Sequence, residues 1–153
     1  MKCRKCKGTM QDATERTASG THGNVTVNLF DLSYAVCPQC GSKAFVHAEF
    51  PAEVLFPLTS AVPHATAKGF RTKEWSCVAC RARIDPSQER VETFAVPLNL
   101  EGRYQFRAEL MLPAVTCDAC GRNQVAADER ALDSDLADAL IAAFDSVGPL
   151  SRW

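Results

Sequence analysis

This chain of 153 residues lacks long apolar runs, segments that resemble a leader, and any cysteine outside a Cys-x-x-Cys pair. The uncharged run from Val54 to Ala67 contains Pro57 and Pro63, and it is too short and too broken to span a bilayer. The N-terminal MKCRKCKG has no apolar region, so we expect no secretion signal there. These absences predict a cytoplasmic protein, whose thiols stay reduced and available to a metal.

The sequence also lacks the signatures of catalysis. It contains no Ser/His/Asp arrangement, no phosphate-binding loop and no dinucleotide fingerprint, so we expect a protein that is not an enzyme. Its three histidines, His22, His47 and His64, are scattered, and we expect them at surface or loop positions. The alternative in which His22 or His64 replaces a metal ligand stays open.

The chain has no large excess of charge of either sign, since its net charge is -1, but the charges are unevenly distributed along it. Residues 1–73 carry nine Lys/Arg against five Asp/Glu, whereas residues 74–153 carry eight against thirteen. The balance argues against a general polyanion binder and leaves a local basic patch possible. The basic start of the chain, with Lys2, Arg4, Lys5 and Lys7, is the candidate for that patch.

Cysteine is what the chain does have, in four Cys-x-x-Cys pairs separated by 30, 36 and 36 residues. The pairs are Cys3/Cys6, Cys37/Cys40, Cys77/Cys80 and Cys117/Cys120. Two such pairs brought together form a tetrahedral cage of four thiolates with Zn–S distances of about 2.3 Å. The spacing therefore predicts two sites of four cysteines, each holding one structural zinc ion.

Other uses of the cysteines remain as alternatives. A rubredoxin-like iron site has the same four-thiolate cage and would transfer electrons. Disulfides would compete if the protein were secreted. Catalytic zinc is disfavoured because four thiolates leave no open coordination position. A thioredoxin-like motif is disfavoured because it needs one reactive pair at a helix N-terminus and not four evenly spaced ones.

The first half of the chain reads as a strand-rich segment followed by an apolar one. Residues 9–23 are polar and predict a loop or a ragged strand. Apolar residues at mostly two-residue intervals over residues 25–36, with a shift near Asp31, predict a strand with a bulge. Residues 44–62 are rich in apolar side chains and predict a short helix, which Pro51 would begin and Pro57 would end or kink. Residues 60–73 are taken as a linker, with a boundary near residue 70.

The second half repeats this order with a clearer pattern. Residues 88–98 and 103–116 predict an antiparallel hairpin with a turn at residues 99–102. Residues 133–147 predict a helix that Asp133 or Ser134 caps and Gly148-Pro149 ends. Its expected apolar stripe is Leu136, Leu140, Ile141, Phe144 and Val147. Asp133, Asp135 and Asp138 are read as N-terminal helix charges, and Asp118 as a solvated acid.

The order knuckle, hairpin, knuckle, helix is thus stated twice, where a knuckle is one Cys-x-x-Cys pair with its turn. Knuckles two and four are followed directly by a glycine, Gly41 or Gly121, and knuckles one and three are not. Because a hairpin brings its ends together, the knuckles at those ends should share a metal. We therefore predict one site of Cys3, Cys6, Cys37 and Cys40 and a second of Cys77, Cys80, Cys117 and Cys120, with intertwined pairing as the alternative.

The predicted fold class is a small metal-stabilised α+β fold of two tandem zinc-ribbon-like lobes, residues 1–70 and 71–153. Each lobe is a β-hairpin or small antiparallel sheet with paired zinc knuckles, followed by a helical segment. Apolar residues beyond the needs of small lobes are expected to pack the lobes together or to form a partner or homodimer surface. These residues are Trp75, Leu150, Trp153 and the segment 50–58.

The first repeat resembles the YgiT-type zinc finger, the N-terminal zinc-binding half of MqsA-type antitoxins. The matching features are the start Met1-Lys2-Cys3-x-x-Cys6, Gly8 and Met10, the strand-rich segment and the Cys37-x-x-Cys40 knuckle before an apolar segment. The second copy is more divergent. The resemblance implies structural zinc in a lobe that binds a protein partner, often a ribonuclease toxin. The DNA-binding helix-turn-helix of full-length antitoxins has no counterpart after Cys120.

The predicted function is therefore that of a non-catalytic, structural-zinc protein that mediates protein–protein interaction. An antitoxin- or immunity-like role is its most concrete version. The first alternative is a nucleic-acid-associated, transcription-related zinc ribbon that uses the basic start of the chain. The second alternative is a rubredoxin-like electron-transfer protein.

Overall fold

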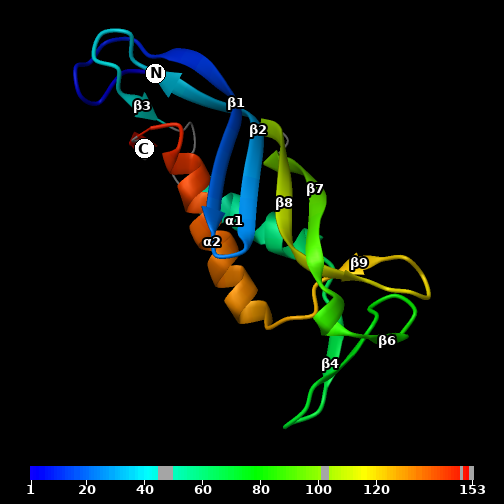
Figure 1. The fold of residues 1–153 in the computed structure, drawn as a ribbon. Helices are drawn as coiled ribbons and strands as arrows, with labels where there is room; N and C mark the ends of the chain where they lie inside the picture. The colour runs from blue at the N-terminus through cyan, green and yellow to red at the C-terminus, as the bar shows by residue number, and fades with distance from the viewer. Residues whose placement is uncertain (45–49, 101–103, 149, 152–153) are drawn as a thin grey trace.

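The computed structural model describes residues 1–44, 50–100, 104–148 and 150–151 (Figure 1). Its elements follow in the order β1 (Gln11–His22), β2 (Val25–Val36), β3 (Lys43–Ala44), α1 (Phe50–Ala61), β4 (Thr66–Lys68), β5 (Glu74–Ser76), β6 (Arg83–Ile84), the 3-10 helix η1 (Pro86–Gln88), β7 (Arg90–Leu100), β8 (Tyr104–Thr116), β9 (Asn123–Gln124), α2 (Glu129–Asp145) and β10 (Leu150–Ser151). The order knuckle, hairpin, knuckle, helix is present in both halves of the chain.

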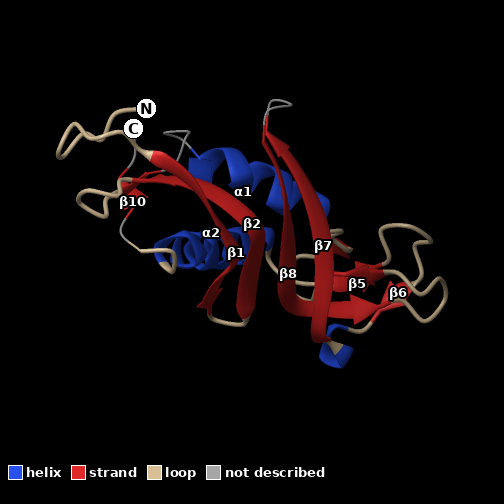
Figure 2. Cartoon of the chain, turned by 90° about the horizontal axis from the view of Figure 1, so that it is seen from above, coloured by secondary structure: helices blue, strands red, loops and turns tan. Residues whose placement is uncertain are grey.

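The two hairpins join edge to edge in one antiparallel sheet. β1 pairs with β2, β2 pairs with β8, and β8 pairs with β7. Figure 2 shows these four strands as one layer with α1 and α2 on the same side of it. The halves on either side of residue 70 therefore share a sheet, and the boundary itself stays a prediction.

The polar segment at residues 9–23, predicted to be a loop or a ragged strand, forms the full strand β1, so the loop alternative is wrong. Its inward side chains are small: Ala18 and Gly20 are buried while their neighbours are exposed. β2 has the predicted shift. Its buried positions change from odd to even numbers at Asp31, which has φ 58. The β1–β2 register is the same on both sides of this residue, so the shift occurs in both strands together.

The second hairpin agrees with its prediction, and its tip at residues 101–103 lies outside the described residues. The segment predicted as a linker, residues 60–73, contains the strand β4. This strand pairs with β5, and β5 pairs with β6, in a separate three-stranded sheet. Trp75 in β5 is half-buried and packs against the apolar cluster that contains Cys77 and Cys117.

Both helices are longer than predicted. α1 continues through Pro57 to Ala61. α2 begins at Glu129, because Asp128 is its N-cap and accepts a hydrogen bond from the Arg130 N–H. The predicted cap at Asp133 or Ser134 is therefore wrong. The acids predicted for the first turn lie one or more turns further along the helix.

The core lies between the sheet and the helices and takes residues from both halves. Leu29, Leu110 and Leu136 are among its fully buried members. On α2, Leu132, Ala139 and Ala143 are buried with most of the predicted stripe. Ile141, which was predicted to belong to that stripe, is 43% exposed.

Each helix packs on the hairpin of the other repeat. α2 contacts β1 and β2, and α1 contacts β7 and α2. A Cβ atom on Gly20 would collide with the backbone O of Ala139 and N of Ala143, so β1 and α2 approach closely. A side chain is absent at Gly20 because the helix backbone occupies its place.

The segments after the helices are exchanged in the same way. After α2, β10 runs parallel to β3 of the first repeat, and the Lys43 ammonium donates to the Val147 carbonyl at 2.6 Å. After α1, the chain runs parallel to the segment after β9, with Ala65 N–H donating to the Val125 carbonyl at 2.9 Å. The repeats therefore interlock, and among the described residues each helix makes its main sheet contacts with the hairpin of the other repeat.

This exchange is nearly symmetric. β3 meets β2 through Ala35↔Ala44 and Val36↔Lys43, and β9 meets β8 through Val115↔Gln124 and Thr116↔Asn123. The second set lies 80 positions after the first. The same displacement relates Asn28 to Ala108 and Leu29 to Glu109. In the β2–β8 ladder Asn28 pairs with Glu109 and Leu29 pairs with Ala108, so the displacement exchanges the two pairs. A pseudo-two-fold axis thus passes through the centre of the sheet.

The fold is therefore a small α+β fold with antiparallel sheets and two groups of four cysteines, as predicted. Helices α1 and α2 are its two α-helices within the described ranges. Neither is long and apolar enough to cross a membrane.

Candidate metal centres

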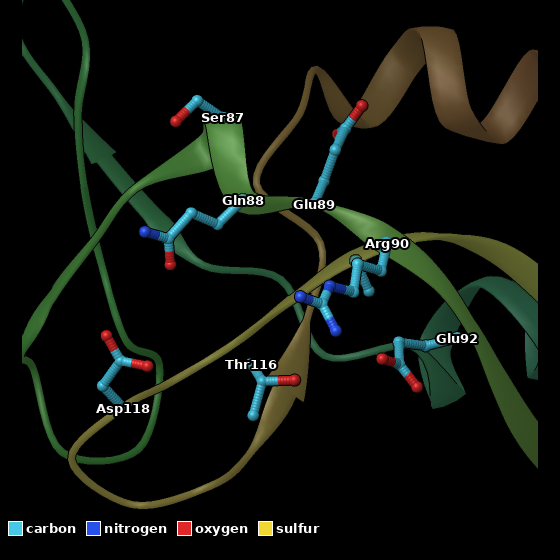
Figure 3. Close-up of a pocket in the computed structure, with 8 residues that line it drawn as sticks. Ser87, Gln88, Glu89, Arg90, Glu92, Thr116 and Asp118 are labelled. Carbon is cyan, nitrogen blue, oxygen red and sulfur yellow. The ribbon is translucent and has the colours of Figure 1, made fainter.

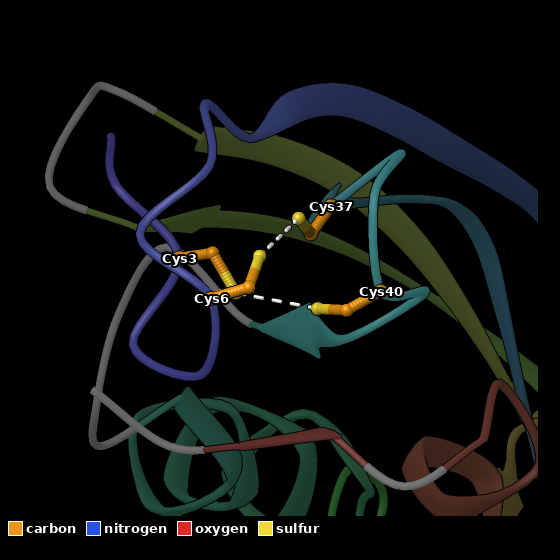
Figure 4. Close-up of side chains that lie close together, drawn as sticks. All are labelled: Cys3, Cys6, Cys37 and Cys40. Carbon is orange, nitrogen blue, oxygen red and sulfur yellow. Dashed lines mark hydrogen bonds between the residues drawn. The ribbon is translucent and has the colours of Figure 1, made fainter.

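The first group of cysteines lies at one end of the sheet, where the start of the chain meets the end of β2 (Figure 4). Cys3 and Cys6 come from the N-terminal knuckle, and Cys37 and Cys40 from the knuckle between β2 and β3. The Sγ atoms of Cys3 and Cys40 are 3.6 Å apart, and those of Cys6 and Cys37 are 3.4 Å apart.

The second group repeats this geometry beside the three-stranded sheet. Its Sγ–Sγ distances are 3.6 Å between Cys77 and Cys120 and 3.5 Å between Cys80 and Cys117. In both groups the first cysteine of each pair is buried. The second cysteine of each pair is nearer to solvent, being exposed or, in Cys40, half-buried.

The four sulfurs of each group fit one metal ion. They all lie within 4.8 Å of one another. A tetrahedron with Zn–S distances of about 2.3 Å has edges of roughly 3.8 Å, close to the separations across each group. All eight cysteines are free, with sulfurs well beyond the disulfide length of about 2.05 Å. The structure brings the cysteines together in the two predicted groups, each of which could hold a metal such as zinc.

All four knuckles have one backbone conformation. In each, the N–H four residues after the first cysteine donates to the carbonyl of that cysteine: the donors are Lys7, Gly41, Arg81 and Gly121. These four residues have φ between 64 and 76. The alternation seen in sequence is therefore one of residue type alone, because Lys7 and Arg81 adopt the left-handed conformation that glycine adopts at lower cost.

The side chains that support the sulfurs differ between the groups. In the first group the Ser42 hydroxyl is 3.1 Å from the Sγ of Cys40. In the second group the amide of Gln124, fully buried, donates to the Sγ of Cys77 at 3.1 Å and accepts from the Val78 N–H at 2.8 Å. Glutamine is usually a surface residue, and no pattern in the sequence identifies Gln124 as a buried hydrogen-bond donor to a sulfur.

Hydrogen bonding prepares one thiolate in each group. The Ser42 hydroxyl and N–H lower the pKa of Cys40 to about 6. The Cys80 N–H and then the Gln124 amide lower the pKa of Cys77 to about 5. Each sulfur is thus ready to bind a cation at neutral pH.

Crowding of the thiols has the opposite effect on a second cysteine in each group. The Gly8 N–H lowers the pKa of Cys6, but the neighbouring thiols of Cys37 and Cys40 outweigh it and raise that pKa to about 12. The Ala82 N–H similarly lowers the pKa of Cys80, and the thiol of Cys117 helps to raise it to about 11. Four thiolates at contact distance repel one another, and a bound cation would offset this repulsion.

The histidines lie outside both groups. His22 ends β1, and its Nε2 is 3.6 Å from Asp135 and 3.5 Å from Asp138 on α2. These two acids therefore face a histidine from the body of the helix and not from its N-terminus. His64 lies in the short pairing with Val125. Neither His22 nor His64 is grouped with the cysteines, and His47 lies outside the described residues.

A polar hollow of about 570 Å³ lies beside the second group (Figure 3). Its lining comes from η1, the start of β7, the end of β8 and the fourth knuckle. Asp118, which the sequence predicts to be a solvated acid, is exposed at this hollow. The other charged residues that line it are Glu89, Arg90 and Glu92.

Comparison of the chain with protein-family models, with curated proteins and with solved structures finds no significant match. The resemblance to the YgiT-type zinc finger therefore rests on the knuckles and the order of elements. What the geometry defines is a class: an α+β protein with two four-cysteine groups that could each bind zinc.

Proposed function

We propose that the chain is a non-catalytic protein in which two structural zinc ions hold a platform for a protein partner. The observation that carries this proposal is the pair of four-cysteine groups, each built from the two ends of one hairpin. Four thiolates complete the coordination of zinc, so neither ion would keep a position for substrate. The role of the metal is then to fix the fold, and the function belongs to the surfaces.

The surface that best fits a protein partner is the face of the sheet opposite the helices. Both α-helices cover one face of the β1–β2–β8–β7 layer (Figure 2). On the other face, Phe30 of β2 and Met111 of β8 are half-buried, and the Arg107 guanidinium stacks over the Phe30 ring at 4.8 Å. Aromatic, Met and Arg side chains are enriched where proteins meet. An antitoxin- or immunity-like role is the most concrete form of this proposal.

The test is affinity capture from the host with the metal-loaded protein and with Met111→Glu. A charge at this half-buried position opposes docking on the sheet face. We expect one stoichiometric protein with the parent chain and its loss with Met111→Glu. The control is Ala131→Glu on α2, an exposed position on the helical side of the sheet. Retention of the same partner by Met111→Glu, or capture of nucleic acid alone, would contradict the proposal.

A further inference from the structure

The β4–β5 hairpin forms a finger at residues 66–76 that projects from the body of the protein (Figure 1). Its two strands pair from Thr66↔Ser76 to Lys68↔Glu74, and the turn follows at residues 69–73. Gly69 has φ 109, and a Cβ atom there would collide with the Thr72 carbonyl, so the turn is tight. The sequence predicts a linker here, whereas the structure has a paired hairpin with a tight turn.

The tip of the finger carries an aromatic side chain with no place in the core. Phe70 is 101% exposed, more than Phe56 on α1 at 76%. An aromatic ring held on a projecting turn presents a flat face on which a nucleobase can stack.

The finger is also the basic part of its neighbourhood. Lys68, Arg71 and Lys73 are all exposed, and no acidic residue occurs between Val54 and Lys73. Glu74 stands opposite Lys68 in the last ladder pair before the turn and offsets that cation. The turn itself carries Arg71 and Lys73 beside Phe70 and no acidic residue, so the tip is positively charged.

A second aromatic side chain and a hollow lie at the base of the finger. Trp75 is half-buried, and the Lys73 ammonium is 6.0 Å from the centre of its ring. The hollow has a volume of about 390 Å³ and is lined in part by Trp75, Lys73 and His64 and also by the acids Asp128 and Glu129. The Nδ1 atom of His64 is buried there and has no hydrogen-bond partner among the described residues. A buried polar atom of this kind calls for a partner from a ligand or water.

We propose that the finger binds single-stranded nucleic acid. Phe70 stacks on one base, the three cations contact the phosphates, and the hollow beside Trp75 receives a neighbouring base next to His64. Aromatic platforms within a positively charged path are the usual means of binding single strands without sequence preference. An anionic membrane would engage the tip but would leave the polar hollow unused. The proposal does not depend on the protein partner proposed above.

The experiment measures fluorescence anisotropy of labelled single strands, about 12 nucleotides long, with the full-length, metal-loaded protein. DNA and RNA of mixed sequence serve as probes. Phe70→Ala should weaken binding about tenfold, as expected for the loss of one stacked base. Replacing Lys68, Arg71 and Lys73 together by Ala should reduce the salt slope by about 2, since each phosphate contact on a single strand contributes about 0.7.

The chain offers matched controls. Phe56→Ala removes an exposed aromatic residue elsewhere, and Ala at Lys2, Arg4 and Lys5 removes three cations from the N-terminal knuckle. Both variants should bind the strands as the parent does. The proposal is overturned if no strand binds, if the controls weaken binding as much as the finger variants, or if vesicles containing phosphatidylserine bind the finger and the strands do not.

Discussion

At one buried position beside the cysteines the first repeat has Ala44, and at the equivalent position the second repeat has Gln124. Both are fully buried, yet only the glutamine donates to a sulfur. The first repeat places its donor on the solvent side instead, as the Ser42 hydroxyl on Cys40. One backbone therefore supports two cysteine sites whose surroundings have diverged, and the sites should differ in how tightly they hold a metal.

The two repeats are nevertheless mechanically one unit, because each helix covers the hairpin of the other. The two sites therefore cannot lose their metals independently of each other's stability. Loss of either site should reach the other through the shared sheet and core.

The largest effect is expected from Cys37→Ser, which removes a fully buried sulfur of the first site. The protein should lose the first metal and several kcal/mol of stability, since structural zinc contributes about 10–16 kcal/mol in isolated fingers. Hydrogen exchange should show that β7 and β8 lose protection together with β1 and β2.

The control for this variant is Ser42→Ala, which keeps all eight cysteines. It should retain both metals and most of the protection. If Cys37→Ser leaves the second hairpin fully protected, the repeats are independent lobes and the interlocked account is wrong.

Gly20→Ala tests the exchange of helices itself. The added Cβ would meet the backbone of α2, and overpacking of this kind costs about 1–3 kcal/mol. Urea denaturation should show a lower midpoint for the whole protein, although neither cysteine site is touched. Thr17→Ala, at an exposed position on the same strand, should change the midpoint little. An unchanged midpoint for Gly20→Ala would mean that α2 does not pack against β1.

Gln124→Ala gives the second site the residue of the first. It removes the amide donor from Cys77 and should weaken metal binding at this site by about 10- to 100-fold. It should also raise the pKa of Cys77 from about 5, because the amide helps to lower it. A proton then competes better with the metal, so the metal should leave at a higher pH during acid titration.

Metal release followed with a chromogenic chelator measures both effects, with Ser42→Ala as the matched change in the first site. Release of the second metal at an unchanged pH would show that Gln124 fills space and does not tune the sulfur.

The smallest effects concern the left-handed residue of each knuckle. Lys7→Gly should stabilise the protein by up to about 1 kcal/mol, and Gly41→Ala should destabilise it by about 1 kcal/mol. No atom outside the neighbouring residues lies within 4 Å of a Cβ on Gly41, so only the backbone conformation opposes the alanine. Thermal unfolding of the two variants beside the parent measures the pair. Shifts of the same sign would contradict the shared knuckle conformation.

The grouping of the cysteines could be predicted because a hairpin joins its ends whatever surrounds it. β2, β8 and most of α2 also followed from their apolar periods. For β1 the sequence leaves a loop and a ragged strand open, because its inward residues, Ala18 and Gly20, are small enough for a helix to lie against them. Small residues give almost no hydrophobic period, so the strand looked like a loop.

The exchange of helices has no local signal at all. The apolar stripe on α2 could pack on either hairpin, and contacts between residues far apart in the sequence decide between them, such as the pairing of β10 with β3 and the close approach of α2 to Gly20. The predicted start of α2 is wrong because both Asp128 and Asp133 are residues that commonly cap a helix, and the sequence does not distinguish them. The finger was missed because Gly69 and the surrounding polar residues are as typical of a linker as of a tight turn.

The central claim is that two four-cysteine groups each hold one zinc ion. Metal analysis of the purified protein together with X-ray absorption at the metal edge tests it most directly. The account predicts two zinc ions per chain, each with four sulfur neighbours at about 2.3 Å. Iron in place of zinc, a single metal per chain, or nitrogen or oxygen among the ligands would contradict it.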